Sequence, residues 1–173
     1  MKLKTSIRAG SGTGSGFGIA HELQPPEQQT RLSGCRVLIF VDADRTTDRT
    51  WAVDITASLF GKCRGTPQRL EFSSHSRPEE QAPLAIVSDM VIIATYRGQE
   101  EFVRKLVKEL RTTRPEIKIV IVTPEVRRIE PGLVDLVYGN SLLGKAGQTK
   151  FVGEIEAMLA RQPKDQNEIE VPK

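Results

Sequence analysis

Two carboxylates, Asp42 and Asp44, stand two residues apart in the stretch "VDADR", directly after an apolar run at residues 36–41. Two acidic side chains on one turn could hold a hard cation such as Mg²⁺ through oxygen ligands. Asp42 also has a simpler use, because an aspartate here can cap the following turn or helix while Asp44 stays in solvent. A Mg²⁺ site at Asp42 and Asp44 is therefore one prediction, and no other cofactor is expected.

Further polar side chains lie where other apolar runs end. Thr95, Tyr96 and Arg97 close one such run, Thr123 closes the next, and Asn140 follows the last. If these runs are parallel strands, their carboxyl ends share the edge of the sheet where ligands bind. These five residues are the candidate functional surface. No catalytic residue is predicted, since a Thr or Tyr hydroxyl is a weak nucleophile without a neighbouring base.

The elements that must position these residues alternate along the chain. Apolar runs of strand length occur at 36–41, 69–74, 89–95, 117–123 and 133–138, and helices are predicted over 47–62 and 78–85. Two further helices are predicted from apolar stripes at helical spacing within 102–110 and 151–159. Strands that are apolar on both faces and alternate with helices indicate a parallel sheet covered on both sides. The predicted fold class is α/β: a three-layer, doubly wound sandwich with a five-stranded, mostly parallel sheet, flavodoxin-like or receiver-like.

The composition divides the 173 residues into three parts. Residues 1–34 hold glycines at every second position from 10 to 18 and then "QPPEQQ", which predicts a flexible arm. Residues 35–161 form the α/β domain, and residues 162–173 are predicted to be a disordered tail. The net charge of +3 and an aromatic content of 5% make a nucleic-acid partner unlikely. No apolar stretch approaches bilayer length, so no membrane partner and a cytoplasmic location are expected.

Residues 35–161 resemble, in element order and spacing, the receiver domain of two-component response regulators. The stretch "RVLIFVDADRTTDRT" is similar to the receiver's first strand and acidic turn, and "SDMVIIATYRG" to its phosphoacceptor strand. The stretch "LVKELRTTRPEIKIVIVT" resembles its third helix and the strand that ends in a switch hydroxyl, the position of Thr123. The resemblance implies a receiver-like fold with a surface on which a protein partner docks.

The chain departs from the receiver pattern at its chemical positions. Asp42 matches the first acid of the receiver's metal-binding pair, but Ala43 stands at the second position and Asp44 comes one place late. Ala94 occupies the phosphoacceptor position, and Gly139 falls near the position of the receiver's Lys. Acyl phosphate formation needs a carboxylate nucleophile, which an alanine methyl cannot replace. The resemblance therefore implies a degenerate receiver whose phosphoacceptor Asp is replaced by Ala94.

The same strands also resemble PIN-like ribonucleases, metal-dependent enzymes of the same layered class. Asp42 matches the acid that ends their first strand, and Glu100 or Glu101 could approximate the later acids. That resemblance implies Mg²⁺ or Mn²⁺ activating water on an RNA phosphodiester. Both glutamates also have a simpler use in the first turn of a helix, paired with Arg104 and Lys105.

The leading hypothesis is a non-catalytic, receiver-like regulatory or scaffolding module that binds a protein partner. The first alternative is a PIN-like ribonuclease that uses Asp42 with nearby acids. The second is a self-assembling structural protomer in which the arm adds to a neighbouring copy, so that the partner is a homo-oligomer.

Overall fold

The computed structural model describes residues 30–73, 75–95 and 98–161 of the chain. Its strands are β1 (Val37–Asp42), β2 (Gln68–Phe72), β3 (Met90–Ala94), β4 (Lys118–Val122) and β5 (Leu136–Tyr138). Its α-helices are α1 (Thr46–Leu59), α2 (Pro78–Gln81), α3 (Glu100–Thr113) and α4 (Gly144–Ala160). Three short 3-10 helices are η1 (Arg31–Gly34), η2 (Ala82–Ala85) and η3 (Val126–Arg128). Tyr96, Arg97, the arm up to residue 29 and the tail from residue 162 lie outside the described residues.

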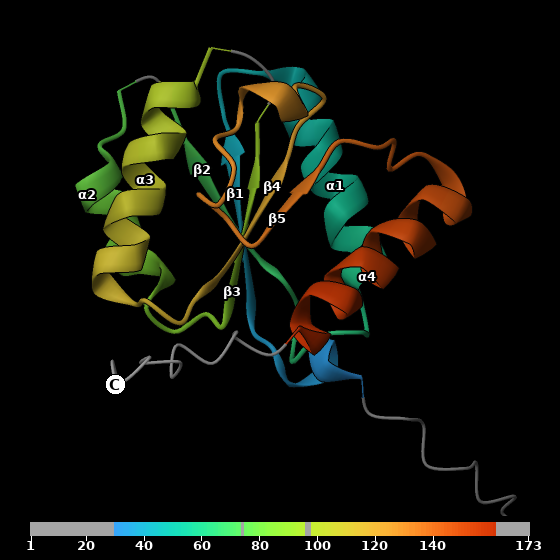
Figure 1. Ribbon diagram of the computed structural model, residues 1–173. Helices are drawn as coiled ribbons and strands as arrows, with labels where there is room; N and C mark the ends of the chain where they lie inside the picture. The colour runs from blue at the N-terminus through green and yellow to red at the C-terminus, as the bar shows by residue number, and fades with distance from the viewer. Residues whose placement is uncertain (1–29, 74, 96–97, 162–173) are drawn as a thin grey trace, which may run out of the picture.

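The five strands form one sheet in the order β2-β1-β3-β4-β5, and every neighbouring pair is parallel. Helices α1 and α4 lie on one face of this sheet, and α2 and α3 lie on the other (Figure 1). This strand order is the doubly wound, flavodoxin-like arrangement. The predicted fold class is confirmed.

The continuous apolar runs form central strands because both faces of each strand are buried. All six residues of β1 and all five of β3 are buried. Alternate residues serve the two halves of the core: Ile39 and Ile92 pack towards α1 and α4, while Phe40 and Ile93 pack towards α2 and α3. None of the helices in the described ranges is long and apolar enough to cross a bilayer.

Three predicted elements differ in extent from those observed. Helix α1 ends at Leu59 and not at residue 62, because the chain turns at Gly61 in the left-handed region, with φ of +70°. The helix predicted over 78–85 divides into α2 and η2, and Pro83 lies in the first turn of η2. The last strand begins at Leu136 and not at residue 133. Just before it, the Asp135 carboxylate accepts the backbone N–H of Ile119 in β4 at 2.8 Å.

The boundary predicted at residue 34 lies inside the folded domain. Leu32 of η1 is fully buried in the core on the α1 and α4 side of the sheet. Its backbone N–H donates to Glu156 of α4 at 3.1 Å, and the Arg31 guanidinium donates to the carbonyl of Leu159 at 2.8 Å. The domain therefore begins by residue 31, because η1 docks on the carboxyl-terminal end of α4.

Candidate functional site

The parallel strands bring the predicted surface residues to one edge of the sheet. Asp42 ends β1, Thr95 directly follows β3, Thr123 directly follows β4 and Asn140 comes two residues after β5. The backbone N–H of Thr95 donates to the Val122 carbonyl at 3.1 Å, so the ladder continues past the strand end. Asp42, Thr95 and Thr123 are buried, whereas Asn140 is exposed. Tyr96 and Arg97 lie outside the described residues.

Asp42 is the centre of a polar network at this edge, which it forms with Asp44, Arg45 and Gln99 and which we call the Asp42 network. The Asp42 side chain has no exposed surface. The Oδ1 atom accepts the backbone N–H of Asp44 at 2.9 Å, and Oδ2 accepts the side-chain amide of Gln99 at 3.0 Å. The guanidinium Nε of Arg45 lies 3.6 Å from Oδ2. Both carboxylate oxygens are therefore committed to protein donors, as a buried charge requires.

Two loops build the Asp42 network from opposite sides. Arg45 stands at the N-cap position of α1 and makes no side-chain cap there. Asp42 caps the preceding turn, because its Oδ1 accepts the backbone N–H of Asp44. Gly98 adopts φ of +77°, and an added Cβ at this position would lie 3.3 Å from Arg45 Nη2. This glycine lets the backbone pass close over the guanidinium and places Gln99, just before α3, against Asp42.

Asp44 contacts the Asp42 network through its backbone N–H, whereas Glu101 pairs along its own helix. Asp44 is exposed, and Glu101 pairs with Lys105 one helical turn along α3 at 2.8 Å. This pairing holds the pKa of Glu101 below its usual value, because the ammonium hydrogen-bonds the carboxylate. Within the described ranges no three His, Cys, Asp or Glu side chains gather to hold a metal ion.

The donor set around Asp42 fits a structural role better than a Mg²⁺ site. Mg²⁺ needs about six oxygen ligands in octahedral geometry. The oxygens of Asp42 instead face an amide N–H, a side-chain amide and a guanidinium that already supplies positive charge. The Mg²⁺ role of Asp42 and Asp44 stays a prediction.

The positions that would carry receiver chemistry hold small residues. Ala94 ends β3 fully buried, paired in register with Val41 on one side and Val122 on the other. Gly139 follows β5 where the chain packs closely on the loop after β4. An added Cβ at Gly139 would clash with Val126 Cγ2 and lie 3.3 Å from the Thr123 carbonyl oxygen. A longer side chain cannot enter at Gly139 without moving this loop.

The crevice between Thr95 and Thr123 is almost filled. Its volume is about 10 Å³, and Gln99, Glu100 and Glu125 also line it. A cavity needs roughly 10–15 Å³ to hold one water molecule. The described part of this crevice therefore has no room for a phosphoryl group or a nucleotide.

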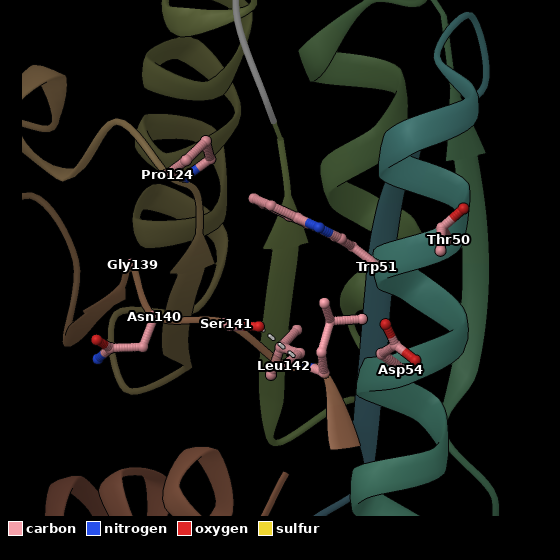
Figure 2. Close-up of a pocket in the computed structure, with 9 residues that line it drawn as sticks. Thr50, Trp51, Asp54, Pro124, Gly139, Asn140, Ser141 and Leu142 are labelled. Atoms are coloured by element: carbon pink, nitrogen blue, oxygen red, sulfur yellow. Dashed lines mark hydrogen bonds between the residues drawn. The ribbon is translucent and has the colours of Figure 1, made fainter. Parts of the chain in front are cut away.

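A larger groove opens beside this crevice, on the α1 and α4 face of the sheet (Figure 2). We call it the α1 groove. Its volume is about 470 Å³, within the usual range of ligand sites. It is lined by Thr50, Trp51, Asp54, Pro124, Gly139, Asn140, Ser141, Leu142 and Leu143. Trp51 reaches from α1 towards Pro124, while Asp54 and Leu142 lie alongside (Figure 2).

The two cysteine thiols lie away from the carboxyl edge of the sheet. Cys35 lies just before β1, and Cys63 lies in the turn after α1. Burial raises the pKa of both thiols above its usual value, and nearby acids add to the effect at Cys35. A raised pKa leaves less of the reactive thiolate, so neither cysteine is a nucleophile candidate.

Sequence reasoning found Asp42 but missed Gln99 and Arg45. The glutamine is 57 positions away from Asp42, and nothing in its local pattern marks it as a buried partner. A weak signal was present in "YRGQEE", where a glycine before a helix start allows a left-handed turn.

No protein-family model and no curated protein matches the chain. Among solved structures, it is similar to a CheY-like protein, TadZ, from Pseudomonas aeruginosa PAO1. The sequences are 17% identical, the TM-score is 0.45, and the match covers 71% of this chain and 98% of the other. The fold assignment rests on the chain's own strand order, which flavodoxin and CheY share. The domain has a receiver-like fold.

Proposed function

We propose that the chain is a non-catalytic, receiver-like regulatory or scaffolding module that binds a protein partner. The observation that carries the proposal is the Asp42 network. A carboxylate whose two oxygens accept N–H donors and face Arg45 has its charge satisfied without a metal. The free thiols Cys35 and Cys63 fit a reducing compartment, and a cytoplasmic location is part of the proposal.

The side chains at the carboxyl edge support binding over phosphoryl transfer. Phosphoryl transfer to a protein side chain needs a nucleophile, a metal and a positioned cation. Ala94 offers a buried methyl group at the position of the nucleophile. Gly139 offers no cation, and the described part of the crevice beside Thr123 has room for about one water.

A partner contact at this edge can be tested by site-specific photo-crosslinking in the full chain. We place the crosslinking amino acid at Asp44, which is exposed at the carboxyl edge. The matched control carries it at Glu116, which is exposed just before β4 at the opposite edge. We expect a discrete protein adduct from position 44 that excess unlabelled chain suppresses, and none from position 116.

Two results would contradict the proposal. Equal adducts from both positions, or none from position 44, would remove the carboxyl edge as the docking surface. Mn²⁺-dependent cleavage of RNA that disappears in Asp42→Asn would replace the binding module with the nuclease.

A further inference from the structure

The α1 groove has a chemistry that the Asp42 network does not use. Trp51, Leu142 and Leu143 supply apolar surface, and Leu143 is 76% exposed at the rim. Asp54 supplies a carboxylate, and it is partly buried. Among the described residues that line it, none is Lys or Arg.

This lining favours an occupant that is both apolar and cationic. An indole face attracts an ammonium or guanidinium group, and a carboxylate beside it adds to that attraction. Leucine side chains contribute binding only when an apolar group covers them. A segment that alternates apolar and basic residues satisfies both demands.

We propose that residues 1–8 of the same chain dock in the α1 groove. Their sequence, "MKLKTSIR", holds Leu3 and Ile7 among three cations, Lys2, Lys4 and Arg8, with no acid. The apolar side chains match the leucines of the groove. The cations match Trp51 and Asp54.

The chain between this segment and the domain has the right length. The described chain begins at Thr30, beside the carboxyl-terminal end of α4, where Arg31 bonds to Leu159. The groove lies at the other end of α4, whose 17 residues span about 25 Å. Residues 9–29 make 21 linking residues, and a Gly-rich random coil of that length has a root-mean-square span of about 25 Å.

A linker whose average span equals the distance to be bridged gives the highest effective concentration at the second site, on the order of millimolar. Residues 1–8 therefore dock even when their intrinsic affinity is modest. The docked segment covers Asn140, a residue of the candidate functional surface. There the docked segment competes with a protein partner. This competition rests on the proposed function, but the docking of the segment does not.

Trp51 is the single tryptophan of the chain and reports directly on the α1 groove. In the arm variant, Lys2, Lys4 and Arg8 are changed to Glu in the full chain. In the wild type, a millimolar effective concentration keeps the groove mostly filled and shields Trp51 from the quencher. We therefore expect acrylamide quenching of Trp51 fluorescence to rise about two-fold in the arm variant. In the control variant Lys62, Lys108 and Lys150, three exposed lysines that do not line the groove, are changed to Glu. Quenching should stay unchanged there.

A groove variant keeps the test independent of the arm substitutions. Asp54→Asn removes the carboxylate with little change in volume and should also increase quenching, while circular dichroism shows an unchanged fold. Equal quenching in wild type, arm variant and control would overturn the proposal. Quenching of the wild type that rises on dilution would also overturn it, because the segment would then come from a second copy.

Discussion

Replacing Asp42 with asparagine separates a structural role of this residue from a metal-binding role. The substitution keeps the size of the side chain and one carbonyl oxygen, which can still accept the N–H of Asp44. Its new NH₂ group faces the side-chain amide of Gln99, which is 3.0 Å from Oδ2 in the native protein. The Gln99 amide must turn over to accept from this group, so both hydrogen bonds of the carboxylate become bonds between neutral groups.

The expected loss of stability follows from burial. Asp42 has no exposed surface, and each of its two hydrogen bonds weakens by about 1 kcal/mol when its charged acceptor becomes neutral. The Arg45 side chain is 39% exposed and can turn into solvent, so its lost ion pair adds little. We expect Asp42→Asn to lower the free energy of unfolding by about 2 kcal/mol, or about 1 M in the urea midpoint.

Urea unfolding followed by Trp51 fluorescence and circular dichroism measures this loss. Asp44→Asn is the matched control: Asp44 is exposed, so the change should stay within about 0.5 kcal/mol. If Asp42 and Asp44 form a metal site, the Asp42→Asn substitution should raise the free energy of unfolding of the metal-free protein. Two acids without their cation repel each other, and removing either charge relieves the repulsion. Greater stability of Asp42→Asn, or Mg²⁺ stabilisation of the wild type that this variant loses, would refute the reasoning.

Two further predictions concern the scaffold. Gly147→Ala should destabilise the protein by about 1–3 kcal/mol, because the added Cβ would lie 2.6 Å from the Ser141 carbonyl oxygen. Gly153→Ala in the same helix should stabilise it by about 1 kcal/mol, because the added Cβ has nothing within 4 Å. If the urea midpoints of both variants move in the same direction, this packing is contradicted. At Asp89, burial raises the pKa but hydrogen bonds and charge from Arg36 outweigh it, so the folded pKa lies below its usual value. Stability from this carboxylate is present above the unfolded pKa and is lost as pH falls through the lowered folded pKa. Asp89→Asn should therefore lower the free energy of unfolding by about 0.5 kcal/mol at pH 7, a small value because Asp89 is partly exposed. The variant should also lose less stability than the wild type below about pH 4. An equal loss in both proteins would show that Asp89 does not contribute to it.

The sequence predicted the strands and the sheet well because burial on both faces leaves a local signal. A central strand of a parallel sheet is buried on both faces, so β1 and β3 appear as continuous apolar runs, broken only by Asp42 at the end of β1. The stripe of α3 is equally local: Val103, Leu106 and Leu110 repeat at helical spacing, and all three are buried.

The parts that sequence reasoning missed depend on contacts between distant segments. The Asp42 network needs a left-handed turn at Gly98 and a glutamine 57 positions from its partner, neither of which follows a period. The docking of η1 depends on the single buried residue Leu32 in a polar, glycine-rich context. Arg111 is a further case: it donates to the Ile117 carbonyl at 2.6 Å and pairs with Asp135, 24 positions away, at 2.7 Å.

Incubation with a small acyl-phosphate donor and Mg²⁺, followed by intact mass measurement at neutral pH, tests the central claim most directly. The claim is that the carboxyl edge binds and does not accept a phosphoryl group. We predict no phosphorylated species, because Ala94 ends β3 and the oxygens of Asp42 are committed to protein donors. A receiver that carries its phosphoacceptor aspartate serves as the positive control. A chemically labile phosphoryl adduct on the full chain that requires Mg²⁺ would contradict the account.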